Sequence, residues 1–273
     1  YSTTDLATLV MRMKENNPDR VIYLADARQS MHFIQVFRCA RKTGIVPDTT
    51  ELVHIGFGTM NGKDGKPFKT RDGGVMRLEY LLKEIDDEML NKIKENQKEK
   101  ENLNIDEAEA EQTAKTVALA AVKYGDLSNQ ASKDYIFDID RFTSFEGNTG
   151  PYILYTIVRI KSILSKYEAN GGDISALKDA IMPAVNAGQK NLMLSLAKFN
   201  ATIESAYEES APHKICAYIY ELANAFNGFY HDTKILSEEN EELKKSYISL
   251  LVLTKEILEA CIDMLGFSAP DRM

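Results

Sequence analysis

VIYLADARQSMHFIQVFRCARKTGIVPDTTELVHIGF, at residues 21–57, contains three elements in the order strand, helix, strand. Val21–Ala25 is a short, nearly continuous apolar run, as expected of a strand that is buried on both faces. A helix should follow over residues 30–42 and end at Gly44, and Leu52–Phe57 should form the second strand. This order predicts two parallel strands joined by a crossover helix. Two strands are too few for a complete doubly wound sheet, so we expect them to be part of a larger domain.

Helical patterns occupy most of the remaining chain. Before the first strand, residues 3–13 form a helix-like segment that Thr4 or Asp5 could cap. Residues 83–111 are highly charged, which favours a solvated helical hairpin or spacer. Almost everything from Thr113 onward is typical of helix, so we expect an all-α bundle there. The expected helix breaks fall at Gly171, Gly172, Pro183, Pro212 and Gly266. The last helix should bury one face made of Leu251, Leu258, Ile262 and Leu265.

Length and composition limit the possible classes of protein. A chain of 273 residues with 44% hydrophobic residues can bury a real core, and we expect two domains. The net charge of −8 argues against a protein that coats nucleic acid non-specifically, but a nucleic-acid binder with its basic residues on one face remains possible. The three cysteines are far apart and form no C-x-x-C pair, which favours a reducing cytoplasm. No apolar run approaches the roughly 20 residues of a membrane span, and no signal peptide opens the chain.

A glycine-rich, basic loop follows the second strand. Residues 58–74, GTMNGKDGKPFKTRDGG, contain five glycines and four cationic residues. Glycines let the backbone approach a ligand closely, lysines add point charge, and Arg71 adds a fork that suits phosphate oxygens. The pattern predicts either a polyphosphate clamp or a solvated basic hairpin loop, and it is not a Walker A loop.

Two further segments carry candidate site residues. Tyr1 and Asp5 are four residues apart and share a face of the first helix, where both could meet one ligand. The alternative is that Asp5 is an ordinary residue at a helix start. Residues 26–33, DARQSMHF, follow the first strand, and ligands of α/β sheets bind at the carboxyl ends of strands. In this turn His32 is either near a ligand or a helix-face histidine without one.

The loop, together with the strand before it, resembles a known family. HIGFGTMNGKDGKPFKTRDGG, at residues 54–74, is similar to the adenine-binding strand and nucleotide-binding loop of class I arginyl-tRNA synthetases. Where the family has K-M-S-K-S or K-M-S-T-R, this chain has Pro67–Arg71, so Lys66 and Lys69 are the two candidates to meet the pyrophosphate. The resemblance implies three catalytic residues, Lys66, Lys69 and Arg71. It also implies six ATP-binding residues, His32, His54, Gly56, Phe57, Lys66 and Lys69.

Two more motifs extend the resemblance to the substrate amino acid. YSTTD, at residues 1–5, resembles the family's Y-x-T-x-D segment, and QSMHF, at residues 29–33, matches its Q-S-x-H-F segment. The resemblance implies that His32 lies on the ATP side. It implies an arginine-binding site made of Tyr1, Asp5 and Gln29. The tripeptide HIG at residues 54–56 lies inside a strand and is not the family's H-I-G-H signature. That signature would precede Tyr1, which is not an initiator Met, so we expect this chain to be a fragment.

The helical part contains a second group of family motifs. DYIFDIDR at residues 134–141 and FEGNTGPYILY at residues 145–155 resemble the family's entry into its anticodon-binding domain. Further matches occur at residues 225–231 and 269–273. The resemblance implies tRNA binding by Asn148, Tyr152, Tyr155, Arg159, Tyr230 and Met273.

The helix that starts near Gly150 has two kinds of face. An aliphatic stripe contains Ile153, Ile157, Ile160 and Leu164. About 160° away around the helix lie Tyr152, Tyr155, Arg159 and Ser162. Aromatic rings beside an arginine suit stacking on unpaired anticodon bases, and packing of the tyrosines in the core is the alternative.

The sequence as a whole predicts two parts. Residues 1–125 should be the second half of a Rossmann-type α/β catalytic domain, with the nucleotide loop and a charged helical spacer, and residues 126–273 an all-α anticodon-binding bundle. The resemblance implies an ATP-dependent, AMP-forming arginine–tRNA ligase whose partners are L-arginine, ATP with Mg²⁺, and tRNA(Arg). We expect a cytoplasmic monomer, with no protein-bound metal and no membrane contact, that binds tRNA but is inactive alone. The alternative is a stand-alone tRNA-binding module without catalysis.

Overall fold

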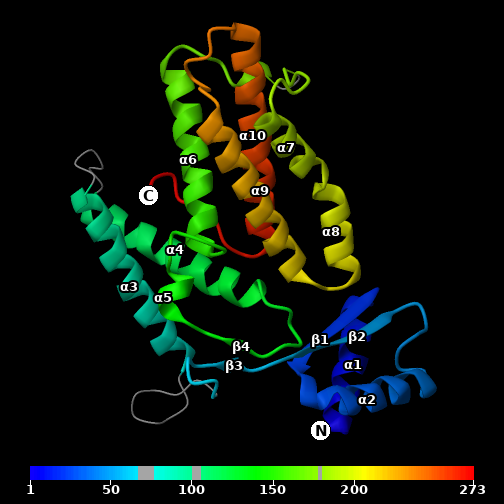
Figure 1. Cartoon of the computed structure of the whole chain (residues 1–273). Helices are drawn as coiled ribbons and strands as arrows, with labels where there is room; N and C mark the ends of the chain where they lie inside the picture. Colours follow the sequence, from blue (N-terminus) through cyan, green and yellow to red (C-terminus); the bar gives the residue numbers. More distant parts are fainter. Residues whose placement is uncertain (67–76, 100–105, 178–179) are drawn as a thin grey trace. The chain divides into compact units, whose positions relative to one another are not determined.

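A computed structural model describes residues 1–66, 77–99, 106–177 and 180–273 (Figure 1). Its packing divides the chain into two compact units. The first unit comprises Tyr1–Pro67 and Gln130–Ile136, and the second comprises Phe68–Asn129 and Phe137–Met273. The domain boundary expected between residues 125 and 126 falls inside a helix that packs within the second unit, so compact units and expected functional domains divide the chain differently.

The first unit is built on a pair of parallel strands. Its elements are α1 (Ser2–Asn16), β1 (Arg20–Asp26), the 3-10 helix η1 (Ala27–Gln29), α2 (Ser30–Lys42), β2 (Glu51–Phe57), β3 (Met60–Asn61) and β4 (Tyr135–Ile136). β1 and β2 pair in parallel along their full lengths, with α2 between them in sequence. The predicted order of strand, helix and strand is confirmed. α2 ends at Lys42, and Gly44 follows with a φ of 71°, the left-handed conformation that glycine adopts most easily.

The core of the first unit lies on one face of this sheet. Residues from α1, β1, α2 and the loop after α2 form one buried cluster, Leu9, Val21, Val36, Ala40 and Val46. On the other face of β1, Ile22 and Leu24 are 48% and 67% exposed. The prediction that the first strand is buried on both faces is therefore wrong for the described residues, because α1 and α2 both contribute to the same cluster on one side.

A short segment from later in the chain joins the first unit. β3 and β4 form a second parallel pair. Beside this pair the Gly58 N–H donates to the Ala131 carbonyl oxygen at 2.9 Å, and the Thr59 N–H donates to the Asp134 carboxylate at 2.6 Å. The bond from Thr59 lowers the pKa of Asp134. Residues 130–136 thus hold the segment that leads from β2 into the glycine-rich loop.

The second unit is all-α within the described ranges, as predicted. Its elements are α3 (Leu78–Glu99), α4 (Glu107–Leu127), α5 (Ile139–Phe142), α6 (Gly150–Ala169), the 3-10 helix η2 (Ser175–Leu177), α7 (Ala187–Ala197), α8 (Phe199–Glu208), α9 (Pro212–Asp232) and α10 (Glu241–Met264). Figure 1 shows α6, α9 and α10 side by side. Pro212 is the first residue of α9 and not the end of a helix, since a proline is tolerated where the N–H has no partner. No helix in the described ranges is long and apolar enough to cross a bilayer.

The charged segment forms a helical pair with one buried face. α3 and α4 pack against each other. On α3 the buried residues recur at every fourth position, at Leu81, Ile85, Met89 and Ile93. This segment is therefore a hairpin as expected, but it is not fully solvated, because its apolar stripe contributes to the core of the second unit.

α6 is the central helix of the second unit. The predicted stripe of Ile153, Ile157, Ile160 and Leu164 is buried, and so is the predicted stripe on α10. Leu154 and Ile163 are buried as well, because α4, α9 and α10 all pack against α6. At the start of α6 the chain approaches α4 closely. A Cβ on Gly150 would lie 2.3 Å from the Ala120 carbonyl oxygen, so only glycine fits there.

Candidate functional site

The side chains of Asp5 and His32 meet in the first unit. His32 Nε2 lies 2.7 Å from Asp5 Oδ2, and the two side chains are 28% and 27% exposed. α1 begins at Ser2 and has no side-chain cap, so the Asp5 carboxylate is not used to cap the helix. The sequence placed His32 on the ATP side, whereas the structure places it against the carboxylate that was expected to receive the arginine side chain.

Phe33 connects the two candidate histidines. Its ring stacks on His54 with 4.7 Å between ring centroids, and the His32 ring meets it edge-on at 5.2 Å. Phe33 is buried, and among the described residues the buried His54 Nε2 has no hydrogen-bond partner. Phe33 belongs to the QSMHF motif but was assigned no role, because only the folded chain shows that it lies between residues of α2 and β2.

An ion pair stands at the carboxyl end of β1. The Arg28 guanidinium donates to both oxygens of Asp26, at 2.9 and 2.6 Å, and the Arg28 N–H adds a bond at 2.8 Å. These bonds lower the pKa of Asp26 to about 2. Nearby at the end of β2, a Cβ on Gly56 would lie 2.8 Å from Ala27 Cα. Gly56 thus allows η1 to pack closely on β2, a structural use of a residue that was predicted to bind ATP.

The remaining candidates of the first unit are surface residues. Four of them are exposed, Tyr1, Gln29, Phe57 and Lys66. Lys66 ends a tight turn in which the Gly62 N–H donates to the Lys66 carbonyl oxygen at 2.8 Å. The Lys66 N–H donates to the Asp64 carboxylate at 3.1 Å. Lys69 and Arg71 lie outside the described residues.

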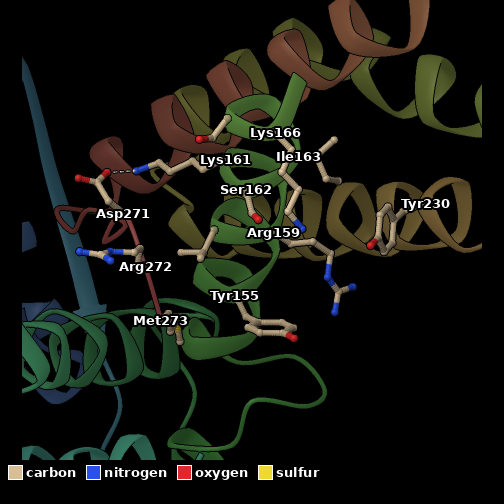
Figure 2. A pocket seen from close by; sticks show the side chains of 12 residues that line it. Tyr155, Arg159, Lys161, Ser162, Ile163, Lys166, Tyr230, Asp271, Arg272 and Met273 are labelled. Atoms are coloured by element: carbon tan, nitrogen blue, oxygen red, sulfur yellow. Dashed lines mark hydrogen bonds and ion pairs between the residues drawn. The ribbon is translucent and has the colours of Figure 1, made fainter. Parts of the chain in front are cut away.

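A cavity of about 940 Å³ lies on the second unit, lined by residues of α6, Tyr230 of α9 and the end of the chain (Figure 2). It brings together four of the six predicted tRNA-binding residues, Tyr155, Arg159, Tyr230 and Met273. Arg159 Cζ lies 4.8 Å from the centroid of the Tyr155 ring and 5.4 Å from that of Tyr230. A guanidinium over an aromatic face is attracted by the negative charge density of the ring. The wall of the cavity therefore combines planar apolar surfaces with a fixed positive charge.

Cationic side chains are concentrated at this cavity. Its lining contains four of them, Arg159, Lys161, Lys166 and Arg272. A single carboxylate side chain, that of Asp271, lies among them. The chain as a whole carries a net charge of −8. Lys161 and Arg272 are paired with carboxylates, so the positive charge of the lining comes mainly from Arg159 and Lys166.

The last residues of the chain are held against the bundle. Lys161 of α6 donates to the Asp271 carboxylate at 3.1 Å. Arg272 pairs with Glu109 of α4 at 3.0 Å. These two contacts fix the residues immediately before Met273, which lines the same cavity as Tyr155 (Figure 2). The terminus therefore sits on the bundle.

Tyr152 and Asn148 do not line the cavity. The Tyr152 ring meets Tyr220 edge-on at 5.7 Å, and its hydroxyl donates to Asn224 Oδ1 at 2.6 Å. Asn148 Oδ1 accepts a hydrogen bond from the buried hydroxyl of Tyr124. Both side chains are thus engaged within the protein, which favours structural roles for these two of the six predicted residues.

Two family models match the chain. The model described as tRNA synthetases class I (R), catalytic domain, matches residues 1–139. The model described as DALR anticodon binding domain matches residues 153–273. The second match contains α6 from near its first turn, the cavity and the C-terminus.

Individual relatives match over the whole chain. The arginine–tRNA ligase of Alkaliphilus oremlandii is 55% identical over 273 residues, which cover 100% of this chain and 45% of that protein. The arginine–tRNA ligase of Francisella tularensis subsp. tularensis is 44% identical over 275 residues, with the same coverage of 100% and 45%. The chain thus spans less than half the length of these relatives.

Solved structures agree with the arrangement of elements. The arginyl-tRNA synthetase of Plasmodium falciparum matches with a TM-score of 0.82 and 28% identity, over 100% of this chain and 44% of that one. The arginyl-tRNA synthetase of Thermus thermophilus matches with a TM-score of 0.77 over 93% of this chain and 41% of that one. Its identity of 24% supports a shared fold alone.

Proposed function

Since the chain belongs to the class I arginyl-tRNA synthetases, we propose that its helical unit binds the anticodon arm of tRNA(Arg) in the cavity described above. One observation carries this proposal. Arg159 lies over both the Tyr155 and the Tyr230 rings at the wall of a basic cavity, and Met273 completes that wall.

These side chains suit an unpaired RNA loop. An unstacked base exposes two apolar faces, and stacking on an aromatic ring contributes about 1–3 kcal/mol per base. The flexible thioether of Met273 can pack on a further base face. Lys166, which also lines the cavity, would supply positive charge for the phosphates between the bases.

For the first unit we propose a share in arginine activation. Asp5 would accept the guanidinium of L-arginine, with Tyr1 and Gln29 as further contacts. His32 Nε2 lies 2.7 Å from Asp5 Oδ2, so the Asp5 carboxylate would exchange this contact for one with the incoming guanidinium. The carboxylate would then remain paired before and after binding.

ATP would lie at the carboxyl ends of β1 and β2, near His54, Gly56 and Phe57. Lys66 and Lys69 would offset the charge that develops on the pyrophosphate leaving group, since catalysis of this kind is mostly positioning and electrostatic stabilisation. The described residues contain no group of three or more His, Cys, Asp or Glu side chains that could hold a metal ion. We propose that Mg²⁺ enters coordinated by the ATP phosphates, as is usual for this ion.

For the 273-residue chain by itself we propose tRNA binding without formation of arginyl-adenylate. The support is that the chain spans 45% of its relatives' length and that Ile22 and Leu24 leave one face of the two-stranded sheet uncovered. Arginine-dependent exchange of labelled pyrophosphate into ATP measures the formation of arginyl-adenylate directly. Exchange at the rate of an intact synthetase would overturn this part of the proposal.

The binding proposal is tested with two RNA hairpins that share one stem. One hairpin carries an arginine anticodon loop and the other an unrelated loop, and fluorescence anisotropy measures their Kd at one salt concentration. We expect binding of the arginine loop at least about tenfold tighter, and Tyr230→Ala should remove most of that difference. The matched control is Tyr207→Ala, an exposed tyrosine of α8. Equal affinity of the wild-type chain for both hairpins would contradict the proposal.

A further inference from the structure

Asn227 lies at the centre of a chain of hydrogen bonds between α6 and α9. Its Oδ1 accepts a hydrogen bond from Arg159 Nη1 at 2.6 Å. Its Nδ2 donates to the Tyr152 hydroxyl at 2.9 Å and to Thr156 Oγ1 at 3.4 Å. The Tyr152 hydroxyl in turn donates to Asn224 Oδ1 at 2.6 Å. One half-buried amide of α9 thus joins three residues that share a face of α6.

The chemistry of Arg159 fixes the direction of this chain. A guanidinium has only N–H donors, so the oxygen of the Asn227 amide must face Arg159. The amide nitrogen then faces the Tyr152 hydroxyl, which accepts from it and donates its own O–H to Asn224. Turning the Asn227 amide around would set its NH₂ group against the guanidinium, where both partners are donors. The network therefore has one favourable arrangement.

The same network gives the Arg159 guanidinium a defined place in the cavity. It lies over the rings of Tyr155 and Tyr230, and the Tyr230 ring is itself supported by Phe226, which stacks on it at 5.9 Å. A free arginine side chain samples many rotamers, and ordering it when a ligand binds costs free energy. A guanidinium that is already held by Asn227 avoids most of that cost.

We propose that Asn227 is a positioning residue for RNA binding: it holds the Arg159 guanidinium over Tyr155 and Tyr230, ready for an unpaired base. Tyr152 acts through Asn227 by means of its hydroxyl and does not stack on the RNA. This inference rests on the proposed binding of an anticodon arm. It separates Tyr152 from Tyr155 on α6, because of these two tyrosines only Tyr155 lines the cavity.

The positioning itself can be measured without RNA. A guanidinium held by a strong hydrogen bond rotates slowly about its Nε–Cζ bond and gives separate Nη signals in ¹⁵N NMR spectra, whereas a free one gives averaged signals. We expect separate signals for Arg159 in the wild-type chain and averaged signals in Asn227→Leu, which keeps the approximate size of the side chain. Averaged signals in the wild type, or separate signals in the variant, would overturn the positioning role.

The consequence for binding is tested with a double-mutant cycle on the arginine anticodon hairpin. Asn227→Leu should weaken binding about tenfold in the wild-type chain, as expected when a hydrogen bond to a charged group is lost. In an Arg159→Met background the same substitution should have almost no effect. Tyr152→Phe, which keeps the ring and removes the hydroxyl, should weaken binding about threefold. The matched control is Asn191→Leu, at an exposed asparagine of α7.

The outcomes distinguish this inference from the proposed function. If the wild-type chain shows no preference for the arginine hairpin, the proposed function fails, and the NMR spectra alone decide the position of Arg159. If the wild-type chain binds the hairpin but Asn227→Leu weakens binding equally in the wild-type and Arg159→Met backgrounds, the inference is wrong. Asn227 would then contribute only to the packing of α6 against α9. The inference is also wrong if Tyr152→Phe binds like the wild type while Tyr152→Leu does not, since the ring would then be the contact. Unfolding temperatures identify any variant that has simply lost its structure.

Discussion

Lys161 Nζ lies 3.1 Å from Asp271 Oδ1, so a cation in the middle of α6 holds the segment that ends the chain (Figure 2). The same amine lies 3.4 Å from Glu259 Oε1 of α10 and donates to the Pro270 carbonyl oxygen at 3.3 Å. The Asp271 side chain is exposed, so its charge alone contributes little to stability. The contacts instead fix the position of the tail, because the Lys161 amine connects α6, α10 and the residues that precede Met273.

This arrangement predicts that the tail matters for RNA binding and not for folding. Deleting Arg272 and Met273 should weaken binding of the arginine anticodon hairpin about tenfold, because one stacking side chain and one cation are lost. Lys161→Met should have a smaller effect in the same direction, and Lys190→Met, at an exposed lysine of α7, should have none. Anisotropy titrations at fixed salt and thermal melts measure both properties. Unchanged affinity in the deletion variant would show that the terminus takes no part.

Asp5→Asn tests the arginine site in a full-length arginyl-tRNA synthetase that contains this chain. The substitution keeps the size of the side chain and removes the charge that would face the guanidinium. Loss of one partner of a partly buried charged pair costs about 3 kcal/mol, so kcat/KM for arginine should fall by roughly two orders of magnitude. Asp19→Asn, at an exposed aspartate before β1, is the control. Wild-type values of kcat and KM for arginine in Asp5→Asn would show that Asp5 does not bind the substrate and is an ordinary residue of the first turn of α1.

Lys66→Ala and Lys69→Ala address the loop in the same full-length enzyme. If either amine meets the pyrophosphate as its charge develops, the substitution should lower kcat about a hundredfold with a much smaller effect on KM for arginine. Lys63→Ala, three residues before Lys66, should leave kcat nearly unchanged. Pyrophosphate exchange at saturating arginine measures this effect. If Lys66→Ala and Lys69→Ala both turn over like the wild type, the clamp has been placed in the wrong loop.

Two glycines of the second unit should respond to alanine in opposite directions. A Cβ at Gly150 would meet the Ala120 carbonyl oxygen at 2.3 Å, so Gly150→Ala should lower the free energy of unfolding by about 1–3 kcal/mol as α6 is pushed from α4. A Cβ at Gly228 of α9 meets nothing within 4 Å, so Gly228→Ala should raise the free energy of unfolding by about 0.5–1 kcal/mol. Urea denaturation gives both values. A neutral Gly150→Ala would mean that the two helices can separate at little cost.

Local patterns were enough to predict most of the elements. The apolar run at Val21–Ala25, the glycine after α2 and the stripe on α6 each depend on neighbours in sequence, and each is confirmed. Pairing between β3 and β4 was not predicted, because two strands of two residues have no periodicity. The exposed face of β1 was also missed, since an apolar run does not reveal how many of its faces the rest of the unit covers.

The candidate site shows the same limit at the level of single side chains. The motif at residues 145–155 indicated Tyr152 and Tyr155 equally, and the two rings lie on neighbouring positions of one helix. The packing of α6 against α9 distinguishes them. The Tyr152 hydroxyl forms hydrogen bonds with Asn224 and Asn227, whereas Tyr155 lines the cavity. Contacts between elements far apart in sequence decide which of two similar residues faces the ligand.

The most direct test of the proposal that RNA binds in this cavity is photocrosslinking. A hairpin with an arginine anticodon loop and a photoreactive base in that loop is irradiated with the wild-type chain, and mass spectrometry locates the modified residues. We predict adducts on Tyr155, Tyr230 or Met273, and their loss when excess unlabelled arginine hairpin competes. Adducts that appear only elsewhere on the chain, and that the unlabelled hairpin also removes, would contradict the assignment of this cavity to the anticodon.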